Sequence, residues 1–168
     1  AGSTEGYVDG TGAGASFASP VGVAVDAAGN VYVADQDNNR IRMISAGGVV
    51  TTLAGSTDRG YLDGPGAAAQ FNWPQGVAVD SVGNVYVADK FNNRIQRFDT
   101  SGNYLGQWGG VGSGNGEFEC PSRVAVDAAA NVYVPGTDHD HVQKLTAARG
   151  SAGPWVGVTA ANGQLPAL

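Results

Sequence analysis

Apolar and polar residues alternate in short runs along most of the chain. Residues 22–26 read GVAVD and residues 30–35 read NVYVAD, and in both runs the valines fall on every second position. Side chains two residues apart lie on one face of a strand, so this alternation predicts β-strands. The intervening AAGN ends in glycine and asparagine, which tolerate the positive φ of a hairpin turn. Residues 40–45 and 49–53 are predicted as the next two strands, and because no window has helical periodicity the chain is predicted to be all-β.

The same pattern occurs three times. Residues 20–41 (PVGVAVDAAGNVYVADQDNNRI), 74–95 (PQGVAVDSVGNVYVADKFNNRI) and 121–142 (PSRVAVDAAANVYVPGTDHDHV) align without gaps. The similarity extends upstream, where residues 1–17 match residues 54–71. A unit of four short antiparallel strands that repeats about every 50 residues is typical of a propeller blade. The sequence therefore predicts three consecutive four-stranded blades.

These residues resemble the NHL repeat. The first two units match the pattern P-x-G-V-A-V-D-x-x-G-N-V-Y-V-A-D-x-x-N-N-R-I at nearly every position, and GSGNGEFECPSRVAVD before the third unit is similar to another common form of the repeat. The resemblance implies a β-propeller, most often a six-bladed ring, and it constrains function only weakly. The predicted divisions are blade 1 at 1–53, blade 2 at 54–108, blade 3 at 109–159 and a C-terminal tail at 160–168.

Three blades are too few to close a ring, since closed propellers have roughly four to eight. The predicted fold is therefore an open arc that exposes one apolar blade face at each end. Exposed faces of this kind bind partners. Two copies would complete a six-bladed ring, the same contact with an axial offset would build a filament, and a longer polypeptide would supply further blades. Self-assembly is the hypothesis that we favour from the sequence.

One comparison between units predicts a side-chain contact. Asp35 ends the second strand and Arg40 begins the third, and Asp89 and Arg94 occupy the same positions in the second unit. Across the hairpin each pair could form a bidentate ion pair. In the third unit a glycine and a histidine replace both partners, as expected if either one alone would be an unpaired, partly buried charge. We interpret both pairs as structural.

Two sequence features are candidates for metal binding. The chain's only two histidines lie on one side of a predicted extended segment, and the candidate metal ligands are Asp138, His139, Asp140 and His141. The other units carry Asn-Asn-Arg there, which favours a solvated turn. The loops YVDGTG (7–12) and YLDGPG (61–66) place Asp beside Gly, but calcium sites need several carboxylates in series. We therefore expect no cofactor, with calcium or zinc as the alternative.

Composition and charge narrow the function classes. Glycine accounts for 27 of 168 residues and charged residues for 14%, which suits short strands joined by tight turns. The net charge of −6 disfavours nucleic-acid binding, RNA-binding NHL domains included. No apolar run approaches the roughly 20 residues that cross a membrane. There is no G-x-S-x-G elbow for a nucleophilic serine, and Cys120 has no second cysteine to pair with.

The predicted function is a non-enzymatic scaffold for protein interaction or self-assembly. Phe91 and Trp155 are the candidate partner-binding aromatic residues, since aromatic side chains often anchor interfaces, and Phe91 stands in an exposed turn. Aspartate-rich, lysine-poor composition and many turns favour an extracellular or periplasmic location. The alternative function is a fragment of an enzyme similar to NHL-type lyases or lactonases, in which a metal ion occupies the central channel.

Overall fold

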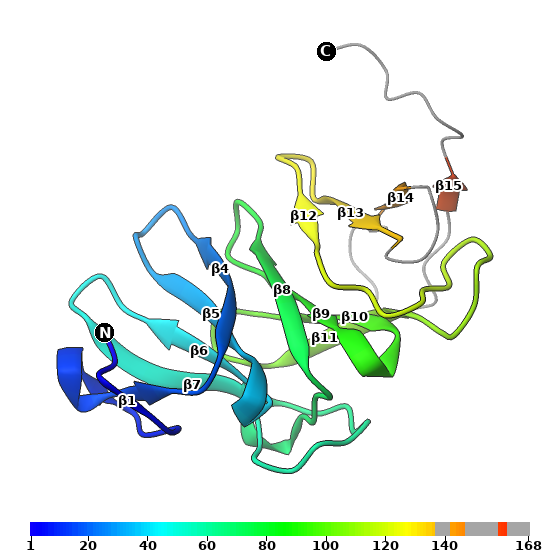
Figure 1. Ribbon diagram of the computed structural model, residues 1–168. Coiled ribbons are helices and arrows are strands. Elements are labelled where there is room, and N and C mark those ends of the chain that lie inside the picture. The colour runs from blue at the N-terminus through cyan, green and yellow to red at the C-terminus, as the bar shows by residue number, and fades with distance from the viewer. Residues whose placement is uncertain (137–141, 147–157, 161–168) are drawn as a thin grey trace.

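The chain folds into three antiparallel sheets that follow one another in sequence. The computed structural model describes residues 1–136, 142–146 and 158–160. The first strand of each sheet, β4 (Pro20–Val25), β8 (Pro74–Val79) or β12 (Ala125–Val126), lies beside the first strand of the next sheet. Figure 1 shows the sheets spreading away from these three inner strands. The arc that they form is open, as the sequence predicted.

Blade 1 has the strand order β7-β6-β5-β4, and a short strand pairs with its outer edge. After β4 its strands are β5 (Val31–Asp35), β6 (Arg40–Ile44) and β7 (Val49–Gly55), and the edge strand is β2 (Gly10–Thr11). The preceding segment also contains β1 (Thr4–Glu5), which pairs in parallel with β3 (Ser16–Phe17), and the 3-10 turn η1 (Gly12–Gly14). The turn η2 (Gln36–Asn38) joins β5 to β6. The four main strands lie within about two residues of their predicted positions.

Blades 2 and 3 repeat this order. Blade 2 continues from β8 with β9 (Val85–Asp89), η4 (Lys90–Asn92), β10 (Arg94–Phe98) and β11 (Tyr104–Gly109), and η3 (Gly66–Ala68) lies in the loop before it. Blade 3 continues from β12 with β13 (Asn131–Pro135), β14 (Val142–Thr146) and β15 (Val158–Ala160). The strand β15 lies at the end of the range 109–159 that was predicted for blade 3, and residues 147–157 lie outside the described part of the chain.

The first hairpin of every blade is fixed by one aspartate. Asp26 Oδ1 accepts hydrogen bonds from the backbone N–H groups of Ala28 and Asn30, both at 2.9 Å. Its Oδ2 accepts from Asn30 Nδ2 at 2.8 Å and from the Tyr32 hydroxyl at 3.0 Å. Asp80 and Asp127 accept the same four bonds in their own hairpins. This local network explains why aspartate, asparagine and tyrosine recur at fixed spacing in all three units.

Acidification is expected to destabilise the fold through these hairpins. The Asn131 side-chain hydrogen bond lowers the pKa of Asp127 to about 2, and the matching bond from Asn30 lowers the pKa of Asp26. An unfolded aspartate has a pKa of about 3.9, so this stabilisation is complete above that pH and is lost as the pH falls towards about 2. Urea midpoints measured at about pH 5 and about pH 2 should differ less for Asp127→Asn than for the wild type. Equal differences would contradict this assignment.

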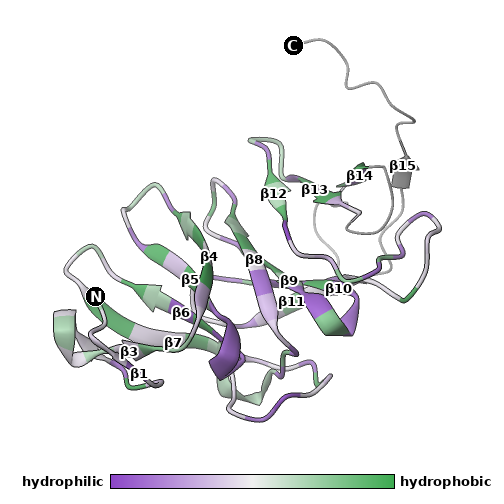
Figure 2. Cartoon of the chain, viewed as in Figure 1, coloured by the Kyte–Doolittle hydropathy of each residue, from purple (hydrophilic) through white to green (hydrophobic). Residues whose placement is uncertain are grey.

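Each blade has two apolar faces, which we name after their residues. In blade 1 the valine face carries Val23, Val25, Val31 and Val33, and the tyrosine face carries Ala24, Tyr32, Ala34 and Ile41. The tyrosine face of blade 1 packs on the valine face of blade 2, where Val77, Val85 and Val87 are buried. The tyrosine face of blade 2 packs in the same way on Val132 and Val134 of blade 3. Apolar residues accordingly run through the strands of all three blades (Figure 2).

The inner strands approach each other closely at one glycine per contact. A Cβ atom built on Gly22 of β4 would overlap the carbonyl oxygen of Gln75. A Cβ atom on Gly76 of β8 would lie 2.8 Å from Cα of Arg123. In both cases the obstacle is backbone, which cannot turn aside as a side chain can. Glycine at this position is therefore part of the way in which one blade packs on the next.

A turn asparagine also joins each blade to the loop of the next one. Asn39, which follows η2 with a left-handed φ of 51°, accepts a hydrogen bond through Oδ1 from Trp73 N at 3.2 Å. Asn93 has a φ of 53° and accepts from Cys120 N at 2.8 Å. Asparagine tolerates the left-handed conformation better than most residues. In both bonds, an asparagine of one blade accepts from the backbone of the loop that leads into the following blade.

Candidate interaction surfaces

A buried ion pair holds the second blade as the sequence predicted. Arg94 Nε donates to Asp89 Oδ2 at 2.7 Å, and both side chains are fully buried. Asp89 also accepts bonds from Asn72 N at 2.7 Å and from Asn92 Nδ2 at 2.8 Å. Burial raises the pKa of the Asp89 carboxyl, and these donors and the Arg94 charge oppose that rise. Because Arg94 also donates to the Gln70 carbonyl, the pair fixes the loop before the blade.

The predicted partner of Asp35 in blade 1 was wrong. Arg40 lies directly opposite Asp35 in the strand register, but Arg42, two residues further on, donates to Asp35 Oδ2 at 2.9 Å. The Arg40 guanidinium lies over the Tyr7 ring instead, 4.4 Å from its centre. The second blade has Gln96 in place of Arg42, and there Arg94 forms the ion pair with the Asp89 carboxylate. Arg40 and Arg42 share one face of β6, and only packing decides between them.

The third blade fills the same place with an uncharged side chain. Gln143 is buried at the position of Arg42 and Gln96, and its Nε2 donates to the Glu117 carbonyl at 2.7 Å. Its Oε1 accepts from Gly116 N at 2.8 Å. In all three blades a buried donor from the third strand therefore binds the carbonyl groups of the preceding loop. This common geometry indicates a structural role and not a ligand site.

The two aspartate-glycine loops are held by the same arginines. Asp9 Oδ1 lies 2.6 Å from Arg42, and Asp63 Oδ1 lies 2.6 Å from Arg94. Each carboxylate thus already has a buried cation as its partner. Across residues 1–136, 142–146 and 158–160, no group of three or more His, Cys, Asp or Glu side chains is placed to hold a metal ion. The candidate ligands Asp138, His139, Asp140 and His141 lie outside the described residues, as does Trp155.

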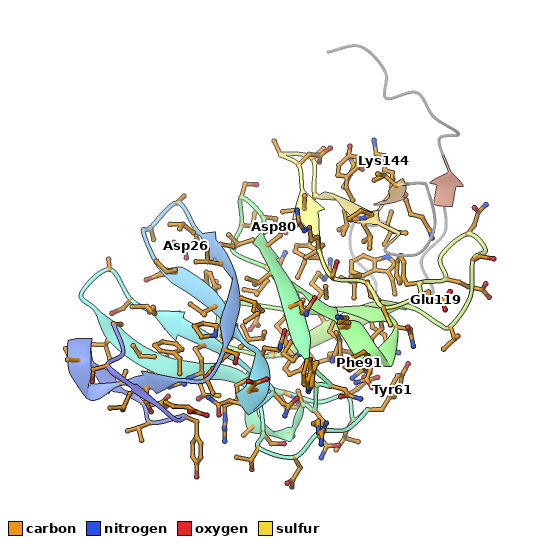
Figure 3. All side chains as sticks on the ribbon, viewed as in Figure 1. Asp26, Tyr61, Asp80, Phe91, Glu119 and Lys144 are labelled. Atoms are coloured by element: carbon orange, nitrogen blue, oxygen red, sulfur yellow. The ribbon has the colours of Figure 1, made fainter. Side chains whose placement is uncertain are left out.

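Phe91 lies at the surface, as predicted for this turn. Its side chain is 46% exposed, its ring centre is 5.5 Å from that of Trp73, and Lys90 Nζ lies 5.2 Å from the ring. Figure 3 shows Phe91 and Tyr61 on the side of the arc opposite the hairpin aspartates Asp26 and Asp80. Tyr61 is 54% exposed and lies over the Arg94 guanidinium. These rings form an exposed aromatic surface of the kind that protein partners use.

The valine face of blade 1 is an exposed apolar surface at its inner strand, β4. Val23 and Val25 are 66% and 60% exposed, and Val21 beside them is 55% exposed. Val77, which occupies the position of Val23 in blade 2, is only 7% exposed because blade 1 covers it. The valine face is therefore buried in blade 2 and exposed to solvent in blade 1. Exposed valines are common singly, whereas a contiguous row of them marks an interaction surface.

Within the described residues, the tyrosine face of blade 3 is also uncovered. Its residues are Arg123, Ala125, Tyr133, Pro135, Val142 and Lys144. Val142 is 46% exposed, whereas Ile95 at the same position in blade 2 is fully buried. Lys144 Nζ lies 5.6 Å from the centre of the Tyr133 ring. This face is consequently more polar than the tyrosine faces of blades 1 and 2.

Comparison with known proteins identifies the repeat. A family model described as NHL repeat matches residues 17–43 and 71–98. NHL repeat-containing protein 3 of Mus musculus is 51% identical over 96 residues, which cover 55% of this chain and 26% of that protein. The Homo sapiens protein of the same name is 47% identical over 96 residues, with the same shares covered. This chain contains NHL repeats.

The NHL-repeat chain spans about a quarter of the length of these curated relatives. Solved structures share its propeller fold at low sequence identity. One is a virginiamycin B lyase from Staphylococcus aureus, with a TM-score of 0.56 and 18% identity over 77% of this chain and 38% of that one. An auxiliary nutrient binding protein from Bacteroides thetaiotaomicron has a TM-score of 0.61 and 15% identity over 73% of this chain and 36% of that one. A chain of a nidogen/laminin complex has a TM-score of 0.55 and 20% identity over 75% of this chain and 43% of that one. Proteins that share this fold thus include an enzyme and binding proteins.

The matched segments contain the exposed valine face of blade 1 and part of the buried networks, but not the open face of blade 3. Arg42 lies in the first segment and Gln96 in the second, whereas Arg123 and Val142 lie in neither. Sequence reasoning missed Arg42, although its replacement by Gln96 between otherwise similar units was a visible signal.

None of the helices in the described part of the chain is long and apolar enough to cross a membrane.

Proposed function

We propose that this chain is a non-enzymatic scaffold that binds proteins through the exposed faces of its outer blades. The observation that supports the proposal is the difference between two equivalent valines, since Val23 is 66% exposed and Val77 is 7% exposed. Burying apolar surface stabilises an association by about 25 cal/mol per Å². The valine face of blade 2 is buried against blade 1, so the equivalent face of blade 1 is expected to be complementary to a further blade.

The aromatic surface around Phe91 is a second contact region in this proposal. It lies at the ends of the strands and not on a blade face, so a partner bound there would leave the valine face free. Self-association as a ring or filament would also use the valine face, because the tyrosine face of blade 3 would dock on the valine face of a second copy. Self-association would therefore cover both blade faces, whereas a partner at Phe91 would cover neither.

The experiment adds a fourth blade to the full chain. Fusing a second copy of residues 1–53 ahead of Ala1 places Leu53 before Ala1-Gly2, which reproduces the natural junction with Ala54-Gly55. The added tyrosine face is expected to cover Val23 and Val25. The fused chain should unfold at a higher urea concentration than the 168-residue chain, and in one transition.

Charged substitutions supply the control. Val23→Glu with Val25→Glu in the original blade 1 should abolish the gain, whereas Val82→Glu should leave it intact, because Val82 is 77% exposed in a hairpin away from this face. If the fused unit unfolds separately, or if the urea midpoint does not rise, the valine face does not bind blades and the proposal is wrong.

A further inference from the structure

The two open faces of the arc differ in one residue of the inner strand. Gly22 in blade 1 and Gly76 in blade 2 stand where the next blade approaches, and Arg123 stands at that position in blade 3. A Cβ atom at Gly22 overlaps the Gln75 carbonyl oxygen, and a Cβ atom at Gly76 comes within 2.8 Å of the Arg123 backbone. Any side chain at this position pushes the following blade away. An arginine also brings a charge that the contact would desolvate.

Among the described residues of this face, the other changes are ones that a blade contact accommodates. Lys144 stands at the position of Arg97, and Arg97 lies on the blade 2 face that blade 3 covers. Val142 replaces Ile95 and keeps the position apolar. Pro135 replaces Ala88 at the end of β13, where the chain leaves the sheet. Arg123 is thus the substitution that collides with backbone.

We infer that Arg123 makes blade 3 a terminal blade, so that the chain accepts a further blade at its valine face but not at its opposite end. The inference rests on the proposed function, because it assumes that the valine face binds blades. The partner for that face is an NHL-type blade with glycine at the position of Gly22, which presents an alanine- and tyrosine-lined face. Blade 3 of a second copy lacks that glycine. Rings and filaments built from this chain alone, which the sequence suggested, are therefore disfavoured in the wild type.

Removing the arginine tests the inference. Sedimentation velocity of the full chain at micromolar concentrations should give a 16.9 kDa monomer for the wild type. Arg123→Gly should produce concentration-dependent species of at least twice that mass, because blade 3 can then dock on the valine face of another copy. Adding Val23→Glu and Val25→Glu should return the Arg123→Gly chain to monomers. Arg59→Gly, which removes the same charge from an exposed loop, should remain monomeric.

The outcomes separate this inference from the proposed function. If Arg123→Gly stays monomeric while the four-blade fusion gains stability, blade 3 is blocked by something other than Arg123 and the inference is wrong. If the wild type already associates and Val23→Glu with Val25→Glu dissociates it, Arg123 does not block docking, although the valine face still binds blades. A fusion that gains no stability overturns the proposed function itself.

Discussion

Replacing Asp89 with alanine is expected to lower the free energy of unfolding by about 3–5 kcal/mol, the range found when one partner of a buried ion pair is removed. The Asp89 carboxylate is fully buried and accepts hydrogen bonds from one backbone amide and three side chains. Its loss leaves the Arg94 guanidinium inside the blade without its buried carboxylate partner. Arg94 also binds the Gln70 carbonyl, so the loop before blade 2 should loosen with the blade.

Urea unfolding followed by far-UV circular dichroism measures this loss. The matched control is Asp63→Ala, which removes the second carboxylate bound to Arg94. Because the Asp63 side chain is 42% exposed, that change should cost no more than about 1 kcal/mol. Should Asp89→Ala prevent folding, Asp89→Asn retains part of the hydrogen bonding and allows the comparison. Equal losses for Asp63→Ala and Asp89→Ala would show that burial does not govern the strength of the pair.

Gly22→Arg is expected to separate blades 1 and 2 and to destabilise the chain by about 3 kcal/mol, the upper end of the usual cost of overpacking a well-packed contact. The substitution reproduces at the first blade contact the residue that blade 3 carries at its open face. Its Cβ atom overlaps the Gln75 carbonyl oxygen, and relief requires β4 to move away from β8. The Gln75–Gln36 side-chain bond, 2.8 Å long, would be strained by the same movement.

Gly47→Arg provides the control for Gly22→Arg. Gly47 lies in an exposed turn, and a Cβ atom there would meet only Ser45 Oγ at 3.8 Å. This variant should unfold within about 0.5 kcal/mol of the wild type, as surface substitutions usually do. Apolar dye binding should rise for Gly22→Arg and not for Gly47→Arg, because only the former exposes Val77 and Val85. A stable Gly22→Arg chain would remove the steric basis for treating Arg123 as a terminator.

The strands and their faces could be predicted because they depend on local alternation. Period-2 valines and the hairpin glycine-asparagine placed β4 and β5 within about two residues. The ion pair at Asp89 followed from the hairpin register, whereas the partner of Asp35 did not. Arg40 and Arg42 both face Asp35, and the choice between them depends on how the loop carrying Asp9 packs on β6. That contact joins residues 33 positions apart, which alternation cannot reveal.

The candidate site was predictable only in outline. An open arc implied two uncovered faces, but the sequence did not show which side of each strand they would occupy. The valine face became visible when Val23 and Val77 could be compared in their packing. The meaning of Arg123 likewise depends on the close backbone approach at Gly22 and Gly76. Among the predicted side chains, Phe91 is exposed as expected, and 138–141 and Trp155 lie outside the described residues.

The asparagine bonds between blades give the order of folding during synthesis a physical basis. Asn39 and Asn93 each bind a backbone amide that is made about 30 residues later, at Trp73 and Cys120. As the chain emerges from the ribosome, each blade therefore keeps an unfilled acceptor until the next loop is translated. Once the chain has emerged as far as Asn93, the acceptor of blade 1 is satisfied and the acceptor of blade 2 still lacks its donor. Protease sensitivity of arrested nascent chains should consequently fall in steps, one blade behind translation.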